Sequence, residues 1–263
     1  MSESKTILLD VTDGVATLTL NRPEKRNALT DAMMDEIRDA IGSLDGHKAR
    51  ALLIDAAGSS FCAGADNSGA ARAIGDAGLD PAPLLEKHSH PTMAALVALK
   101  IPVVAAVQGA ATGIGVGIAL TADFVLASPR ARFLVGYAKI GLVPDGGTGW
   151  LVTRLVGRTR AAEIMMLNES LDAERALELG LVHRVVAEDA LAGEARALAK
   201  RLAEGPTRAL GLIRRQMFEA EEQTFEQALA GDLEKQHITI RSADAREGIA
   251  ALVAKRPPQF TGR

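Results

Sequence analysis

Short apolar runs separated by polar turns predict strands over roughly the first two-thirds of the chain. Residues 6–10 and 15–20 are expected to form two strands joined by Asp13-Gly14, a dipeptide typical of hairpins. The run at 103–107 contains no charged residue, and the run at 51–56 contains only Asp55, as expected for buried strands. These strands would supply the centre of the core.

Between the strands, apolar residues recur with the spacing of an α-helix. Thr30 is the expected N-cap of a helix that runs to about Ser43. Further helices are expected at about 83–99, after the glycine-rich stretch 109–115 through Ala122, and at 144–155, 158–167 and 172–179, and residues 180–186 are expected to form a turn and one more strand. From about 189 onward the pattern is only helical, with breaks at Gly205-Pro206 and around Ser242. Alternating strands and helices predict an α/β fold whose parallel or mixed sheet lies under helices.

Composition limits the class of protein. The 263 residues are 48% apolar, enough for a sizeable core, and the net charge of −3 with no basic stripe argues against nucleic acid as a partner. The single cysteine, Cys62, excludes an intramolecular disulfide and a cysteine-cluster metal site. The first residues lack the apolar segment of a secretory signal, and the apolar stretch at 103–126 is interrupted by polar residues. We therefore expect a soluble, cytoplasmic protein without a membrane span.

Two stretches of small residues follow strands and would leave the backbone uncovered. They are Phe61–Ser68 and Gly109–Gly115. Such stretches suit a ligand that lies directly on main-chain N–H groups, although small residues after a strand can also serve only to avoid clashes. Residues 69–82, rich in Gly, Ala and Asp without a clear period, are expected to form a mobile surface segment nearby.

Several motifs occur in a specific order along nearly the whole chain: Leu20–Leu29, Phe61–Asp66, Gln108–Gly113, Ile140–Gly147, Ala176–Val182 and the tail Lys255–Phe260. In these motifs the sequence resembles the crotonase family, the enoyl-CoA hydratases and isomerases. The resemblance implies a crotonase-like spiral of ββα units over residues 1–196, followed by a helical trimerisation region at 197–263. It also implies a homotrimer or hexamer that binds an acyl-CoA thioester. Coenzyme A would be part of the substrate, with no separate cofactor and no metal.

The resemblance also implies how the thioester is held. The backbone N–H groups of Ala65 and Ile114 would bind the oxyanion that develops on the thioester oxygen, where preorganised donors are most effective. The residues expected to bind the coenzyme A moiety are Arg22, Lys25, Arg26, Ala63 and Asp66. The basic residues alone would suggest only a solvated charged loop, and Asp66 could instead cap a helix.

The hydratases of this family use two glutamates, and both are missing here. The corresponding positions are Gly117, in the helix after the second stretch, and Tyr137, seven residues before Pro144. Adding water needs one group to activate it and another to deliver a proton, and glycine can do neither. Tyr137 and Gly117 are therefore assigned to the acyl pocket, where Tyr137 could donate a hydrogen bond or simply pack.

One carboxylate remains. Asp145 follows Pro144 and matches the aspartate of a subgroup that resembles the Δ3,Δ2-enoyl-CoA isomerases and the ring-epoxide isomerase of phenylacetyl-CoA breakdown. The sequence allows Asp145 to be a proton shuttle or only an N-cap, because Asp before a helix often caps it. The first hypothesis is an acyl-CoA isomerase. Alternatives are a hydratase without the usual glutamates, an aryl-CoA dehalogenase with Asp145 as nucleophile, and a non-catalytic acyl-CoA-binding protein.

Overall fold

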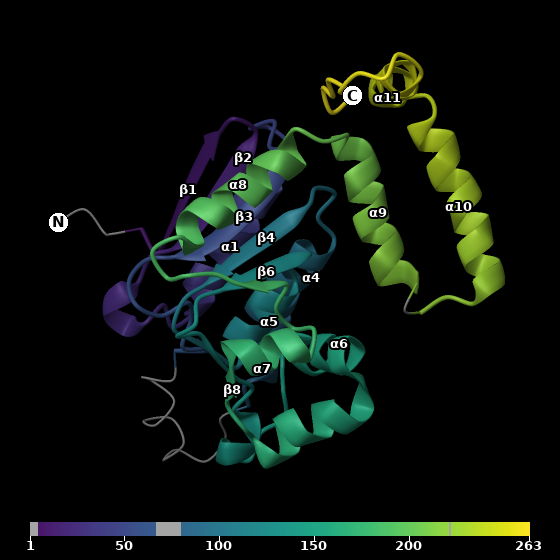
Figure 1. Cartoon of the computed structure of the whole chain (residues 1–263). Coiled ribbons are helices and arrows are strands. Elements are labelled where there is room, and N and C mark those ends of the chain that lie inside the picture. The colour runs from purple at the N-terminus through teal and green to yellow at the C-terminus, as the bar shows by residue number, and fades with distance from the viewer. Residues whose placement is uncertain (1–4, 67–79, 221) are drawn as a thin grey trace.

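The computed structural model describes residues 5–66, 80–220 and 222–263, and its strands form two sheets (Figure 1). The larger sheet has the order β1-β2-β3-β4-β6-β9, and the smaller has the order β5-β7-β8. Only β1–β2 is antiparallel in the larger sheet, whereas β7–β8 is antiparallel in the smaller. The bounds are β1 Ile7–Thr12, β2 Val15–Leu20, β3 Ala51–Ala56, β4 Val103–Val107, β5 Ala110–Thr112, β6 Phe124–Ala127, β7 Arg132–Leu134, β8 Leu171–Asp172 and β9 Arg184–Val185. The predicted mixed sheet is confirmed.

Helices cover both faces of the larger sheet. The α-helices are α1 Asp31–Ser43, α3 Ala82–Leu84, α4 His90–Val97, α5 Ile114–Leu120, α6 Thr148–Ala162, α7 Ala173–Glu178, α8 Leu191–Ala203, α9 Thr207–Ala220, α10 Phe225–Thr239 and α11 Ala243–Val253. Short 3₁₀ segments occupy Pro23–Lys25 and Tyr137–Ile140, and π-helical segments occupy Leu85–Ser89 and Glu163–Leu167. In Figure 1 α8 lies across one face, with α1 and α4 behind the sheet.

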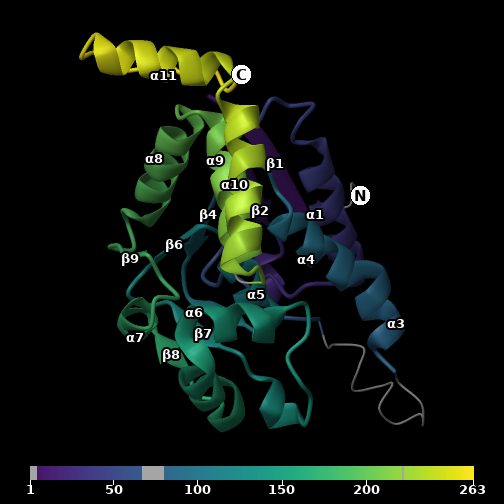
Figure 2. The same cartoon turned by 90° about the vertical axis from the view of Figure 1, so that its right-hand side faces the viewer.

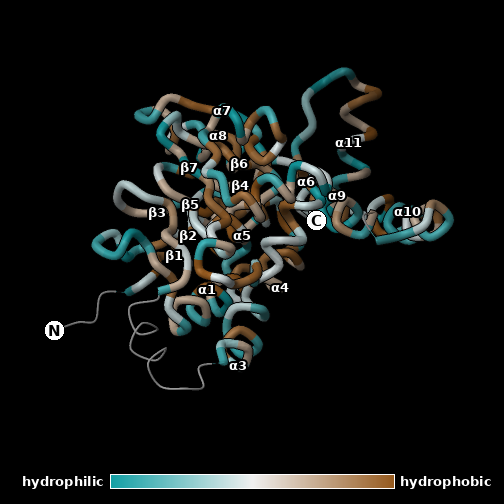
Figure 3. Tube along the Cα trace, turned by 90° about the horizontal axis from the view of Figure 1, so that it is seen from below, coloured by the Kyte–Doolittle hydropathy of each residue, from teal (hydrophilic) through white to brown (hydrophobic). Residues whose placement is uncertain are grey.

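Alternation along each strand divides the core between these two faces. On β4, Val104 and Ala106 pack against α8, whereas Val103, Ala105 and Val107 join the larger cluster with α1, α4 and α5. Successive side chains of a strand point to opposite faces, so a strand buried on both sides must be apolar throughout. Viewed from below, the hydrophobic positions gather around β4, β6 and α5 (Figure 3).

Some predicted boundaries need correction. The helix expected from Pro144 begins only at Thr148, whereas the break expected between residues 155 and 158 is present at Gly157, whose φ is 74°. The stretch expected to lead straight into a helix first forms the short strand β5. The C-terminal region has a further break before α10, where the Thr224 side chain and Gln227 form a capping box. The mobile segment expected at 69–82 falls mostly outside the described residues.

The C-terminal helices leave the core in steps. Helix α9 is fixed to it, because a Cβ on Gly211 would lie 1.9 Å from the Lys100 carbonyl oxygen. The buried Arg214 of α9 donates to the Thr121 carbonyl at 2.6 Å and pairs with Asp123 at 3.3 Å. Helices α10 and α11 then extend away from the sheets (Figure 1), and α11 projects beyond the rest of the molecule in the turned view (Figure 2). They expose several large apolar side chains, among them Phe225, Leu229, Leu233, Leu252 and Val253.

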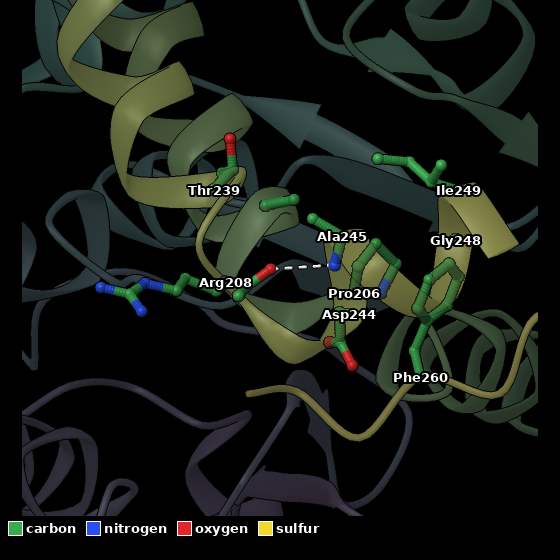
Figure 4. Close-up of a pocket in the computed structure, with 10 residues that line it drawn as sticks. Pro206, Arg208, Thr239, Asp244, Ala245, Gly248, Ile249 and Phe260 are labelled. Atoms are coloured by element: carbon green, nitrogen blue, oxygen red, sulfur yellow. Dashed lines mark hydrogen bonds between the residues drawn. The ribbon is translucent and has the colours of Figure 1, made fainter.

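A groove separates the start of α9 from α11 (Figure 4). It has a volume of about 280 Å³, and the Phe260 ring of the chain's tail closes one side against Gly248. Asp244 beside it accepts backbone N–H groups of Thr261 and Gly262 at 2.7 and 2.8 Å. The tail is thus tied back onto α11. In the part of the chain that the structure describes, no helix is both long and apolar enough to cross a membrane.

Candidate functional site

The two stretches of small residues lie side by side. Cys62 donates its backbone N–H to the Ala110 carbonyl at 2.9 Å, and its own carbonyl accepts from the Thr112 N–H at 2.9 Å. Gly115 lies so close that a Cβ there would be 2.7 Å from the Cys62 Cβ. Cys62 is fully buried, and burial raises the pKa of its thiol to about 12. Its role in this region is therefore packing.

Gly64 brings the first stretch onto the second. Its φ of +90° suits glycine, and a Cβ there would lie 2.9 Å from the Thr112 carbonyl oxygen. On the other side, Leu29 donates to the Gly64 carbonyl and accepts from the Asp66 N–H, both at 2.8 Å. These two bonds flank Ala65, whose own N–H consequently points away from Leu29. Among the described residues no acceptor meets this N–H, and Ala65 is exposed.

The second donor stands at the start of α5. Ile114 is the first residue of this helix, so its N–H has no partner within the helix. Gly113 precedes it with φ of 55°, and it lies close to Gly64. No other described group accepts from the Ile114 N–H. The structure thus brings the two predicted oxyanion donors onto adjoining segments, and their action on a thioester stays a prediction.

Asp145 makes a side-chain contact that the sequence did not specify. The Tyr137 hydroxyl donates to Asp145 Oδ1 at 2.5 Å. The N-cap of α6 is Gly147, and among the described groups no side chain caps this helix. The alternative that Asp145 is only a helix cap is therefore wrong. The carboxylate is instead held by a phenol from the preceding turn.

Tyr137 sits between Asp145 and the second stretch. Its hydroxyl would be 3.5 Å from a Cβ on Gly113, the residue before the Ile114 donor. Burial first, and then the hydrogen bond and negative charge of Asp145, raise the pKa of Tyr137 well above its usual value. The phenol therefore keeps its proton at physiological pH. It can act here as a hydrogen-bond donor but not as a base.

Gly117 lies on α5 beneath two other side chains. A Cβ there would be 2.5 Å from Thr148 Oγ1 and 3.2 Å from Met93 Cε. The space that a longer side chain would need at position 117 is thus already filled. Gly117 thus packs against Met93 and Thr148, and Thr148 in turn lies beside Tyr137 and Asp145. Sequence reasoning missed Thr148, because a threonine in the first turn of a helix carries no distinctive signal.

A cavity of about 500 Å³ opens next to this group. Gly146, which follows Asp145, lines it together with Met93 of α4, Trp150 of α6 and Phe218 of α9. The Trp150 and Phe218 rings stack with centroids 6.4 Å apart. Gly146 also lies against Ile114, since a Cβ there would be 2.8 Å from Ile114 Cδ1. An apolar group bound in this cavity would therefore lie near both Asp145 and Ile114.

The residues predicted to bind coenzyme A occupy neighbouring loops, but they differ in exposure and in the contacts that they already make. Arg22 pairs with Asp66 at 2.9 Å and also donates to the Ala28 carbonyl, so its guanidinium is already engaged. Lys25 and Arg26 are exposed, and neither forms an ion pair with any described residue. The Ala63 N–H donates to the Arg26 carbonyl at 2.9 Å. Of the three predicted basic residues, Lys25 and Arg26 are therefore the two whose side chains are available to a phosphate.

Asn27 fixes the shape of this loop, and sequence reasoning missed it. It is fully buried with φ of 55°, a left-handed conformation that asparagine tolerates. Its amide donates to the carbonyls of Ala57 and Ser60 at 2.9 Å, and its Oδ1 accepts from the Arg22 N–H at 2.8 Å. Within the described ranges, no group of three or more His, Cys, Asp or Glu side chains could hold a metal ion.

Comparison with known proteins identifies relatives along the whole chain. Residues 10–263 match the family model described as enoyl-CoA hydratase/isomerase. The chain is 40% identical over 265 residues to the 1,2-epoxyphenylacetyl-CoA isomerase of Escherichia coli K12, with 98% of each chain covered. It is 37% identical over 259 residues to a protein of Rhodobacter capsulatus named "Probable enoyl-CoA hydratase", again with 98% of each covered.

Solved structures of related proteins also match along the whole chain. The crystal structure of an enoyl-CoA hydratase/isomerase from Cupriavidus metallidurans CH34 superposes with a TM-score of 0.91 at 32% identity. The match covers 100% of this chain and 98% of that one. The predicted crotonase-like fold is thereby confirmed. The relatives carry both isomerase and hydratase names, so the choice of reaction depends on the side chains described above.

Proposed function

The chain belongs to the enoyl-CoA hydratase/isomerase family, and from that premise we propose that it is an isomerase of acyl-CoA thioesters. It would shift a double bond, or rearrange a ring-derived acyl group, through an enolate. The observation that carries the proposal is the pairing of one carboxylate, Asp145, with the Tyr137 phenol beside an uncovered backbone donor.

The first step is to hold the thioester. Its carbonyl oxygen would accept hydrogen bonds from the Ala65 and Ile114 N–H groups, which have no acceptor among the described residues. Such donors bind the oxygen more strongly as it gains negative charge, which lowers the barrier to enolate formation. Lys25 and Arg26 would meet the phosphates of coenzyme A at the other end, where their charge gives attraction and direct pairing.

The second step is proton transfer by one carboxylate. With a 3-enoyl-CoA, Asp145 would remove a proton from C2 to give a dienolate and return it at C4, leaving the double bond between C2 and C3. The same proton leaves and returns, so no second acid or base is required. Tyr137, which keeps its proton, would steady Asp145 and oppose its rotation.

Hydration is disfavoured by what is missing. A hydratase needs groups that activate water and deliver a proton, yet position 117 is a glycine covered by Thr148 and Met93. Position 137 carries a phenol whose pKa is raised rather than a carboxylate. Isomerisation requires only the remaining carboxylate and the oxyanion donors.

We further propose that the enzyme assembles as a homotrimer, alone or paired into a hexamer, through its C-terminal helices. The exposed apolar side chains of α10 and α11, including Phe225, Leu233 and Leu252, support this assembly. A surface of this kind normally marks a protein–protein contact.

The test uses 3-enoyl-CoA and 2-enoyl-CoA in separate incubations. We expect the first to become 2-enoyl-CoA without uptake of water, and Asp145→Asn to lose at least 10³-fold in kcat while it still binds an acyl-CoA. Rapid formation of 3-hydroxyacyl-CoA would favour a hydratase instead. Release of halide from a haloaryl-CoA would indicate a dehalogenase, and binding without turnover of any ester would indicate a non-catalytic protein.

A further inference from the structure

Thr148 carries a buried hydroxyl that the proposed reaction does not yet use. The residue is 0% exposed, and its Oγ1 has no hydrogen-bond partner among the described residues. Buried hydroxyls are almost always paired because an unpaired one destabilises the folded state. An unpaired hydroxyl beside a candidate active site therefore suggests a role in another step of the enzyme's cycle.

Thr148 lies beside both members of the Tyr137–Asp145 pair. Its backbone N–H already donates to the Asp145 carbonyl at 2.9 Å, which fixes the residue next to the carboxylate. One side of Oγ1 faces the bare Cα of Gly117. The hydroxyl also lies near enough to the Tyr137 phenol to lower its pKa, although the two oxygens do not meet hydrogen-bond geometry.

We propose that Thr148 is a positioning residue, whose hydroxyl donates to Tyr137 Oη when an acyl-CoA is bound and so directs the phenol proton to Asp145. The proposal rests on the isomerase function above. Hydrogen bonds of this kind are often long in the free enzyme and shorten in the complex with substrate. The resulting chain runs from Thr148 O–H to Tyr137 Oη–H to Asp145 Oδ1, and no proton leaves either hydroxyl.

The chain of hydroxyls has a specific chemical consequence. The Tyr137 hydroxyl donates one hydrogen bond and can accept another. If it accepts from Thr148, the Tyr137 proton can point only toward Asp145. One oxygen of the carboxylate is then held, and Oδ2 is the oxygen left for the acyl carbon. Loss of the hydroxyl should slow proton transfer without weakening the binding of the ester.

Thr148→Val and Thr148→Ser test this role through kcat, KM and Tm. For Thr148→Val we expect a loss of about tenfold in kcat, the effect of one hydrogen bond, with KM within about twofold. Its Tm should be unchanged or higher, because the substitution removes an unpaired buried hydroxyl. Thr148→Ser keeps the hydroxyl and should retain most of the kcat of the wild type.

Thr153→Val is the matched control. Thr153 lies on the same helix, but its hydroxyl donates to the Gly149 carbonyl at 2.7 Å within that helix. The kcat of Thr153→Val should therefore match that of the wild type. Full kcat in Thr148→Val would overturn the proposal. An equal loss in Thr148→Ser, or a Tm that falls together with kcat in Thr148→Val, would indicate that only packing is involved.

A readout that does not depend on activity separates this proposal from the isomerase function. Tyr137 is the only tyrosine, so the absorbance of tyrosinate reports on it alone. In an Asp145→Asn background saturated with an acyl-CoA, adding Thr148→Val should raise the pH midpoint of this titration, because the hydroxyl lowers the pKa of the phenol. Equal midpoints would overturn the role of Thr148, whereas failure of every enoyl-CoA to react would overturn the isomerase function and leave this result standing.

Discussion

The two halves of the candidate site are built in different ways. The half proposed to bind an oxyanion consists of backbone, and Ala65 and Ile114 are positioned by main-chain hydrogen bonds of their neighbours and by close packing of Gly64 on Thr112. The half proposed to transfer the proton consists of side chains, with Tyr137 hydrogen-bonded to Asp145 and Thr148 beside them. Binding of a thioester would therefore depend on the path of the chain, whereas the choice of reaction would depend on a few replaceable groups.

After Asp145→Asn, Gly64→Ala should have the largest effect, because it displaces the backbone half. A Cβ at this residue would lie 2.9 Å from the Thr112 carbonyl, and φ is +90°, so the loop must move. Displacing one oxyanion donor should lower kcat by about 10²–10³-fold in the isomerase assay. Gly42→Ala on α1, where a Cβ meets nothing, should keep full activity. Full kcat in Gly64→Ala would remove the Ala65 N–H from the site.

Tyr137→Phe acts on the side-chain half and should have a smaller effect. It removes a hydrogen bond to a carboxylate, worth about 1.5–3 kcal/mol, so kcat should fall by about 10–100-fold. The oxyanion donors are untouched, so KM should change little. A rise in KM with kcat preserved would show instead that Tyr137 contributes to binding the acyl group.

Lys25→Ala and Arg26→Ala should have a still smaller effect. Both side chains are exposed, and an exposed ion pair contributes about 0–1 kcal/mol, so each variant should raise KM by up to about fivefold. Assays at increasing salt should reduce the difference from the wild type, since exposed charges are screened. If neither KM nor its salt dependence changes, this loop does not contact the phosphates.

The titration of Tyr137 tests the side-chain half by itself. It should leave the rate at neutral pH unchanged, because the phenol keeps its proton there. The pKa of Tyr137 is raised in the folded protein, whereas in the unfolded chain it should be about 10. Stability from this group is therefore complete below pH of about 10 and is lost as pH rises toward the higher folded value. Tyrosinate absorbance should appear near pH 10 only in denatured protein, and a native midpoint there would contradict the buried pair.

Much of the fold followed from the sequence because most strands and helices have clear hydrophobic periods. The strands at 51–56 and 103–107 coincide with β3 and β4. The strand β5 was missed because three residues within a glycine-rich stretch are too few to show a period. The break before α10 was also missed, although Thr224 and Gln227 carry the spacing of a capping box.

The site was less predictable, for a physical reason. Asp145 and Tyr137 are eight residues apart, and no regular element relates them. Their contact depends on the turn between them, where Gly141 adopts a positive φ. Thr148 becomes informative only once Gly117 is seen beneath it, because these two residues lie on different helices. The sequence pattern indicates which residues share a face of one helix or strand. It does not indicate which side chains of different elements come into contact.

The contact between Gly117 and Thr148 has a consequence for how the family's activities can diverge. A glutamate at position 117 would place its Cβ 2.5 Å from Thr148 Oγ1, so Gly117→Glu alone meets a side chain that has to shift. Replacing Thr148 by alanine first removes this hydroxyl contact and leaves the flexible end of Met93, at 3.2 Å, as the nearest neighbour. A mutational path from this chain to a two-carboxylate enzyme is therefore ordered: the change at 148 is permissive, and the same glutamate that is harmful before it becomes acceptable after it.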